Sequence, residues 1–241
     1  AVELMNSRAK MLGMNGTVYT DCTGMGEGNV TTAKDTALLC SELAKYKNLT
    51  PYLTCWLDTV RDGKAELVNL NRLVRTYKGV TGMKAWGSEK AGSCIAATAE
   101  KGDMSVCVVL NGCDSQEDMN AEAKKLLNLA FDTYEIYTPE LPEDMVKETV
   151  VCGGEELSVK LAPEGLYPIV IPRGTYRMVE CDFTAEEKLD APVKNGETAG
   201  EIRYTMGGEV ILEGKIVACK EVKKMNFICG IKKLVYNLLS M

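Results

Sequence analysis

The sequence predicts an α+β protein with two folded parts and a terminal helix, and three observations lead to this. Residues 1–142 mix helical apolar periodicity with short apolar strands. Residues 146–225 carry only short alternating segments separated by turn residues, a pattern typical of a small all-β sandwich. Residues 226–241 form one amphipathic stretch. A chain of 241 residues is long enough for two cores of ordinary size.

Composition narrows the classes of function. A hydrophobic content of 46% with 26% charged residues describes a globular protein, and a net charge of -6 argues against a nucleic-acid partner. No run of eighteen apolar residues predicts a membrane-spanning helix. The ten cysteines come without a C-x-x-C pair or a histidine, so we expect no metal site and no cofactor. We expect most of them to be small buried side chains.

Two helices are predicted near the start of the chain. The first covers Val2 to Leu12 and ends at Gly13, and the second covers Ala33 to Tyr46 after a cap at Thr31 or Thr32. Asp35 lies in the first turn of the second helix, where a carboxylate suits the helix dipole.

The segment that follows predicts two extended arms around the turn at Asp62-Gly63, covering Leu53 to Val60 and Glu66 to Leu73. In the second arm, Asn69 and Asn71 point to the same side and can hydrogen-bond a loop backbone.

The glycine-rich stretch from Gly79 to Gly92 precedes a predicted strand pair, Cys94 to Ala99 and Ser105 to Leu110. Lys84 lies within it, at the head of the predicted sheet. Because glycine allows a ligand backbone to approach closely, Lys84 is a candidate binding residue in a groove. The competing interpretation is a solvated lysine in a glycine-rich turn.

A third long helix is predicted from Gln116 to Phe131, capped by Ser115. Its apolar stripe consists of Met119, Ala123, Leu126, Leu127 and Ala130. Pro139 and Pro142 then break the pattern and mark a domain boundary. The amphipathic stretch 226–241 is too short to span a bilayer. It lies either on a membrane surface or against the sandwich, and the sequence favours neither.

Ser7 and Lys10 spell S-x-x-K, the spacing of a serine nucleophile and its lysine base. This pair needs a buried helix start to work, whereas polar neighbours surround it here. We interpret the match as coincidence.

Several short stretches, taken in order along the whole chain, resemble the serine-type D-alanyl-D-alanine carboxypeptidases, the low-molecular-mass penicillin-binding proteins. They are LMNSRAKMLGM (4–14), Thr23-Gly24, TTAKDTALL (31–39), NLNRLV (69–74), GVTGMK (79–84), KAGSCIAATA (90–99), AKKLL (123–127) and LDAPVKNGETAG (189–200). The resemblance implies a partial β-lactamase/transpeptidase-like domain over 1–142, a β-sandwich over 146–225 and an amphipathic, membrane-associated helix over 226–241.

The family's chemistry uses an S-x-x-K nucleophile, an S-x-N triplet and a K-T-G strand at the edge of the cleft. The resemblance places the first two motifs upstream of Ala1, so no complete catalytic set is expected in this chain. It assigns substrate binding to the third motif, at Lys84, Ala85, Trp86 and Gly87. This motif is altered, because Ala85 and Trp86 stand where the family has threonine and glycine.

Two functions therefore stay open. The first is part of a serine-type carboxypeptidase that trims peptidoglycan stem peptides through an acyl-serine and is inactive by itself. The second is a non-catalytic relative that binds peptidoglycan, membrane or a protein. The resemblance implies peptidoglycan stem peptides and β-lactams as ligands. It also implies a bacterial, extracytoplasmic location facing the cell wall, peripheral to the cytoplasmic membrane.

Overall fold

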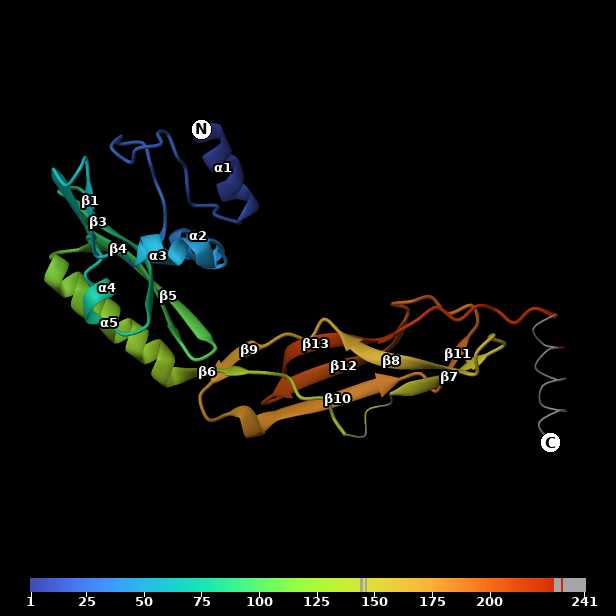
Figure 1. Ribbon diagram of the computed structural model, residues 1–241. Helices are drawn as coiled ribbons and strands as arrows, with labels where there is room; N and C mark the ends of the chain where they lie inside the picture. Colours follow the sequence, from blue (N-terminus) through green and yellow to red (C-terminus); the bar gives the residue numbers. More distant parts are fainter. Residues whose placement is uncertain (144, 146, 228–230, 232–241) are drawn as a thin grey trace. The chain divides into compact units, whose positions relative to one another are not determined.

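The computed structural model describes residues 1–143, 145, 147–227 and 231. The chain forms two compact units, Ala1–Tyr134 and Glu135–Met241, each with its own secondary structure (Figure 1). The α+β fold class with an all-β second part is confirmed. The predicted terminal helix over 226–241 lies almost entirely outside the described residues. The predicted domain limits at 142 and 146 stay a prediction.

The first unit surrounds a three-stranded antiparallel sheet of order β3-β4-β5. Figure 1 shows α5 along one side of this sheet and α2 on the other. The elements of this unit are α1 (Val2–Met11), α2 (Ala33–Ala44), η1 (Lys47–Leu49), α3 (Thr50–Leu53), β1 (Leu57–Val60), β2 (Ala65–Val68), α4 (Leu73–Thr76), β3 (Val80–Ser88), β4 (Gly92–Lys101), β5 (Met104–Cys113) and α5 (Gln116–Thr133).

The start of α2 is as the sequence predicts. Thr32 has extended backbone, and its hydroxyl accepts a hydrogen bond from the Asp35 N–H at 3.1 Å. The helix ends at Ala44 rather than Tyr46, because a new 3-10 turn begins at Lys47 and α3 begins at Thr50, with Pro51 in its first turn.

The cap of α5 and most of its buried stripe are also confirmed. The Ser115 hydroxyl accepts from the Asp118 N–H at 3.0 Å, and Met119, Ala123 and Leu127 are buried. The stripe was wrong at Leu126, which is 38% exposed. The helix runs on to Thr133, and Phe131 is buried in the next turn. A continuous apolar run does not by itself tell which of two adjacent leucines faces the sheet.

The two predicted extended arms are shorter than expected. Only β1 and β2 pair, while Leu53 and Leu73 belong to the short helices α3 and α4. The Asn71 side chain accepts a hydrogen bond from the Leu73 N–H at 3.1 Å, which stabilises the start of α4. A short polar side chain thereby ends the extended pattern.

The second unit is all-β in its described part. Its main sheet has the order β10-β12-β13-β8-β7-β11, in which only β11 runs parallel to its neighbour, and β6 pairs separately with β9. The strands are β6 (Tyr134–Tyr137), β7 (Glu148–Cys152), β8 (Ser158–Glu164), β9 (Ile169–Pro172), β10 (Val179–Ala185), β11 (Lys188–Asp190), β12 (Thr198–Met206) and β13 (Glu209–Ala218), with the 3-10 turn η2 (Tyr176–Met178) before β10.

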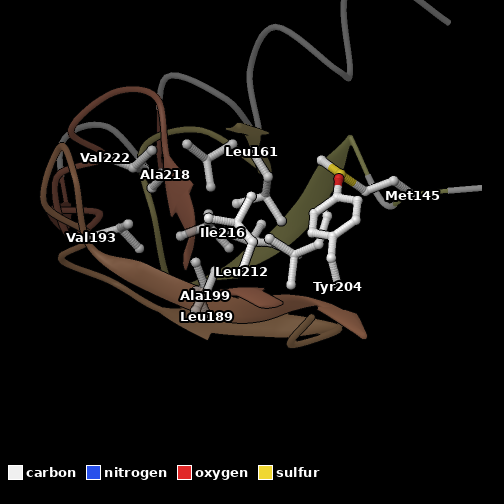
Figure 2. Packing of buried hydrophobic residues seen from close by; sticks show 13 residues of the cluster. Met145, Leu161, Leu189, Val193, Ala199, Tyr204, Leu212, Ile216, Ala218 and Val222 are labelled. Carbon is white, nitrogen blue, oxygen red and sulfur yellow. The ribbon is translucent and has the colours of Figure 1, made fainter. Parts of the chain in front are cut away.

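The core of the second unit is formed mainly by residues of the six-stranded sheet, and Tyr137 of β6 and Ile169 of β9 pack against it. Figure 2 shows Leu161, Tyr204, Leu212 and Ile216 gathered in one apolar cluster. Alternation along the strands produces it, because Ile202 and Tyr204 of β12 and Leu212, Ile216 and Ala218 of β13 point inward. The Tyr204 hydroxyl donates to the Glu140 carbonyl at 2.9 Å, which satisfies the polar end of a fully buried ring.

The expectation that most cysteines are buried was wrong. Of the nine cysteines that the structure describes, only Cys40 and Cys94 are buried, whereas Cys22, Cys55, Cys152 and Cys219 are exposed in loops or at strand ends. No disulfide links these nine. Within the described ranges, no helix is both long and apolar enough to cross a bilayer.

Candidate functional site

Lys84 lies in the middle of β3, the edge strand of the first unit's sheet. The competing interpretation of a lysine in a turn was wrong, because β3 continues to Ser88 and the turn follows it. Lys84 is opposite Ala96 of β4 and its side chain is exposed. The outer edge of β3 has no strand partner among the described residues. Lys84 therefore presents a cation beside an unpaired strand edge.

Side chains alternate along this strand, and this separates the four candidate residues. Lys84 and Trp86 point to one face of the sheet, and Trp86 is 46% exposed. Ala85 points to the other face and is 3% exposed. The structure thus brings Lys84 and Trp86 together on one surface and separates Ala85 from it.

Gly87 completes the candidate set at the end of the strand. A Cβ at this position would lie 3.0 Å from the Gly92 carbonyl oxygen of β4. The close approach of the two backbones therefore explains why residue 87 is a glycine. The preceding residue, Trp86, has no such restriction and carries a large side chain. The adjoining turn is held by the Ala91 N–H, which donates to the Ser88 hydroxyl at 3.1 Å.

The start of β3 is fixed from two sides. The Thr81 hydroxyl donates to the Thr98 hydroxyl of β4 at 2.8 Å. A Cβ at Gly82 would lie 3.0 Å from the Leu53 Cβ, so α3 packs directly on the strand. These contacts connect the start of the strand that carries Lys84 to β4 and to α3.

Asn69 has the role that its sequence position predicts. Its Nδ2 donates to the carbonyls of Leu53 and Cys55, at 3.2 and 3.0 Å. This holds the loop that follows α3 and leads into β1. Asn69 is therefore a scaffold residue of the site's surroundings.

A buried carboxylate anchors α2. Asp35 Oδ2 accepts from the Thr17 hydroxyl at 2.7 Å and from the Gly16 N–H at 2.8 Å. The Thr17 hydrogen bond, with smaller contributions from Gly16, Thr32 and Lys34, holds the pKa of Asp35 below its usual value against the effect of burial. The ion is consequently the stable form of this residue in the fold.

The S-x-x-K match at Ser7 and Lys10 forms no catalytic pair. Both side chains are exposed on α1, whose only buried residue is Ala9. Within residues 1–143, 145, 147–227 and 231, no three histidine, cysteine, aspartate or glutamate side chains gather as metal ligands.

Sequence reasoning did not predict that α2, which carries the buried Cys40, packs on β5, which carries the partly exposed Cys107.

Comparisons with known proteins show which families the two parts of the chain match. Residues 1–114 match the family model described as D-alanyl-D-alanine carboxypeptidase, and residues 131–224 match that of the penicillin-binding protein 5 C-terminal domain. The D-alanyl-D-alanine carboxypeptidase DacF of Bacillus subtilis is 31% identical over 237 residues, which cover 96% of this chain and 61% of that protein. DacC of Escherichia coli is 29% identical over 229 residues, covering 94% and 57%.

Two solved structures extend the comparison. Penicillin-binding protein 5 from Haemophilus influenzae has a TM-score of 0.77 at 24% identity and shares the fold over 92% of this chain and 66% of its own. Penicillin-binding protein D2 from Listeria monocytogenes, solved in its cefotaxime-bound form, has a TM-score of 0.50 at 28% identity, covering 54% of each chain. The chain spans about three-fifths of the length of the curated relatives it matches.

Proposed function

Because this chain belongs to the D-alanyl-D-alanine carboxypeptidase family, we propose that its first unit supplies one wall of a peptide-binding cleft. The ligand is the D-alanyl-D-alanine end of a peptidoglycan stem peptide. We propose acyl-serine hydrolysis of this peptide as the activity of the whole protein. The 241 residues by themselves do not perform it.

The observation that carries the proposal is the exposed ammonium of Lys84 at the free edge of β3. A peptide that ends in a carboxylate gains a charge-assisted contact there. Its backbone can run beside the unpaired edge of the strand, whose N–H and C=O groups are available. The contacts at Thr81 and Gly82 keep this edge in place before the ligand arrives.

The prediction that the chain alone is inactive follows from its missing nucleophile pair. Ser7 and Lys10 are both exposed on α1. Loss of the nucleophile from an enzyme of this kind lowers the rate by about a million-fold. Ala85 cannot replace the hydroxyl that the family's threonine supplies, which weakens the remaining contacts further.

A fluorescent penicillin tests the catalytic half of the proposal. We expect the purified 241-residue chain to carry no covalent label after denaturation and mass spectrometry. Hydrolysis of a diacetyl-L-Lys-D-Ala-D-Ala peptide should equal the uncatalysed rate. A covalent adduct that maps to Ser7 or to any other serine would overturn this half.

Nuclear magnetic resonance titration with the same peptide tests the binding half. We expect amide shifts along β3, and we expect Lys84→Ala to remove them. Lys101→Ala is the matched control, because Lys101 is an exposed lysine at the far end of β4. A peptide ending in L-Ala-L-Ala controls for stereochemistry. Equal shifts with both peptides, or in both variants, would refute a specific site at Lys84.

A second candidate function is binding without catalysis, and the position of Trp86 favours it. Its indole is 46% exposed on the same face as Lys84, where it adds an aromatic surface beside the cation. Trp86→Gly separates the two functions. If the whole protein hydrolyses the peptide, removing the indole clears the groove and the variant should bind the peptide more tightly. If the protein only binds the peptide, the variant loses its aromatic contact and should bind more weakly.

The remaining partners follow from the relatives and the sequence. We propose β-lactams as ligands of the whole protein, since penicillin-binding protein D2 was solved with cefotaxime and with ampicillin. We also propose an extracytoplasmic location facing the cell wall, with residues 226–241 on the membrane surface. Co-sedimentation with anionic vesicles, compared between the full chain and a chain ending at residue 225, tests the membrane contact.

A further inference from the structure

The segment between Val18 and Val30 is a closed loop, which we call the Asp21 loop. Val18 and Val30 exchange two backbone hydrogen bonds at 2.9 Å, so the two ends of the loop lie side by side. Inside the loop, Asp21 Oδ1 accepts from the Thr23 N–H at 2.7 Å, and Asp21 Oδ2 accepts from Asn29 Nδ2 at 3.0 Å. Both oxygens of one carboxylate therefore brace the loop from within.

The Asp21 loop lies next to the end of β3. Its residue Glu27 forms an ion pair with Lys90, which is in the turn that follows β3. The Ala91 N–H of that turn donates to the hydroxyl of Ser88, the last residue of the strand. The Glu27 and Lys90 side chains are 81% and 79% exposed, so their ion pair adds little stability. It shows where the loop lies, and the carboxylate of Asp21 gives the loop its shape.

The opposite end of the strand is covered by α3. Gly82, Lys84 and Trp86 are opposite alternate residues of β4, so they share one face of the sheet. A Cβ at Gly82 would lie 3.0 Å from the Leu53 Cβ, which shows that α3 packs on this face beside Lys84. A peptide whose carboxylate contacts Lys84 therefore extends towards Trp86 and the Asp21 loop.

The spacing along an extended chain identifies the peptide residue that reaches this loop. Each residue of an extended chain advances by about 3.3 Å, so the third residue from the carboxylate is about 7 Å from the last one. Trp86 is two residues after Lys84 along β3, which is the same advance. The residue that precedes D-alanyl-D-alanine is therefore level with Trp86, on the side of Lys84 where the Asp21 loop is paired with the turn.

Met25 is the side chain of the Asp21 loop that suits such a contact. It is 89% exposed and lies two residues before Glu27. A methionine side chain is apolar and unbranched, so it adapts to an aliphatic partner. Because the loop is braced before the ligand arrives, the contact requires little further ordering of the protein.

We propose that Met25 is a specificity-determining residue of the peptide site, and that it contacts a long aliphatic side chain on the residue that precedes D-alanyl-D-alanine. Asp21 is the positioning residue that holds the loop in its shape. This inference rests on the proposed function, because it assigns a further contact to the same site. The preferred ligand is a peptide with a long side chain at its third residue from the carboxylate.

Nuclear magnetic resonance titration of the 241-residue chain with two peptides tests the contact. Diacetyl-L-Lys-D-Ala-D-Ala carries the long side chain, and acetyl-Gly-D-Ala-D-Ala lacks it. We expect Met25→Ala to weaken binding of the lysyl peptide by about five-fold, as partial exposure of an apolar contact predicts, and to leave binding of the glycyl peptide unchanged. Met11→Ala is the matched control, because Met11 is a 73% exposed methionine on α1. Equal losses for the two peptides, or an unchanged affinity for the lysyl peptide, would overturn the role of Met25.

Asp21→Asn tests the positioning role. An amide cannot accept hydrogen bonds on both of its side-chain atoms, so we expect faster hydrogen exchange of the Thr23 amide and the same selective loss of the lysyl peptide. Asp103→Asn, at an exposed turn, should change neither. If the Thr23 amide exchanges faster while the preference for the lysyl peptide is kept, Asp21 does not position Met25. The Met25→Ala result is read without this variant, so the main test stands even where Asp21→Asn fails to fold.

Lys84→Ala separates this inference from the proposed function. If both peptides bind the wild type through Lys84 and Met25→Ala binds them equally well, only the role of Met25 is refuted. If neither peptide shifts the amides of β3 in the wild type, the peptide site itself is refuted, and the role of Met25 with it.

Discussion

Asp35 Oδ2 and Thr17 Oγ1 lie 2.7 Å apart, and this hydrogen bond joins the loop after α1 to the first turn of α2. The same oxygen accepts from the Gly16 N–H at 2.8 Å, so one carboxylate satisfies two donors of the loop. The helix that carries Cys40 is therefore positioned by a charge at its start.

Asp35→Asn should destabilise the first unit, because the amide replaces an anion at the helix start and cannot accept both hydrogen bonds with the same strength. The pKa of Asp35 is lowered in the fold, so its contribution to stability is present above the ordinary value of about 4. This contribution is lost as the pH falls through the folded-state pKa. Amide exchange of α2 between pH 6 and pH 3 measures it.

Asp103→Asn is the control for that experiment, because Asp103 is an exposed turn residue. We expect the control to follow the wild type at every pH. If Asp35→Asn also follows the wild type, Asp35 does not stabilise α2 as described.

Leu127→Ala should lower the free energy of unfolding of the first unit by about 2–5 kcal/mol. Leu127 is fully buried between α5 and the sheet, so its truncation leaves a cavity. Leu126→Ala removes the same atoms from a side chain that is 38% exposed and should cost less than about 1 kcal/mol. The free energy of unfolding of each variant is measured by urea denaturation, with the hydrogen exchange of the β4 amides as the signal for unfolding of the first unit. Equal effects of the two variants would show that the face of α5 has been assigned incorrectly.

Gly87→Ala should destabilise the β3–β4 pair by about 1–3 kcal/mol. The added Cβ would lie 3.0 Å from the Gly92 carbonyl oxygen, which is backbone and has little freedom to move. Faster amide exchange at Trp86 and Ser88 is the expected signal. Glu89→Ala in the adjoining exposed turn should leave these amides unchanged.

Tyr204→Phe should destabilise the second unit by about 0.5–1.5 kcal/mol, because the Glu140 carbonyl loses its donor. Burial, together with Cys181, raises the pKa of Tyr204. The protonated phenol is therefore the stable form in the fold, and its contribution is fully present below the ordinary tyrosine value of about 10. It is lost as the pH rises further, because the unfolded chain releases this proton more readily.

Denaturation of the second unit between pH 8 and pH 11 measures this dependence. Tyr167→Phe serves as the control, since Tyr167 is 61% exposed. A steep alkaline loss of stability that persists in Tyr204→Phe would assign the effect to another group.

Local sequence signals predicted the parts of the fold that depend on neighbouring residues. The caps at Thr32 and Ser115 were predicted because each requires only a hydroxyl three residues before its donor. The buried positions Met119, Ala123 and Leu127 followed from helical spacing. Leu126 did not, because the apolar stripe is wider than the surface that the sheet covers.

The candidate site was only partly predictable. The glycines around Lys84 were compatible with a turn. In the structure Gly82 and Gly87 lie within strand β3, where Gly87 comes close to β4 and Gly82 comes close to α3. The separation of Ala85 from Trp86 depends on the pairing register, which no single strand fixes by itself. The packing of α2 on β5 depends on contacts between segments far apart in the sequence, and no local pattern encodes it.

The pairing of β8 with β13 in the second unit determines when that unit can form during synthesis. Leu161 on β8 is opposite Ala218 at the end of β13, so the sheet cannot close until almost the whole unit has left the ribosome. The first unit's strands β3, β4 and β5 pair only with their nearest neighbours along the chain. We therefore expect them to assemble as successive hairpins while translation continues, and the second unit to fold only after its last strand has emerged.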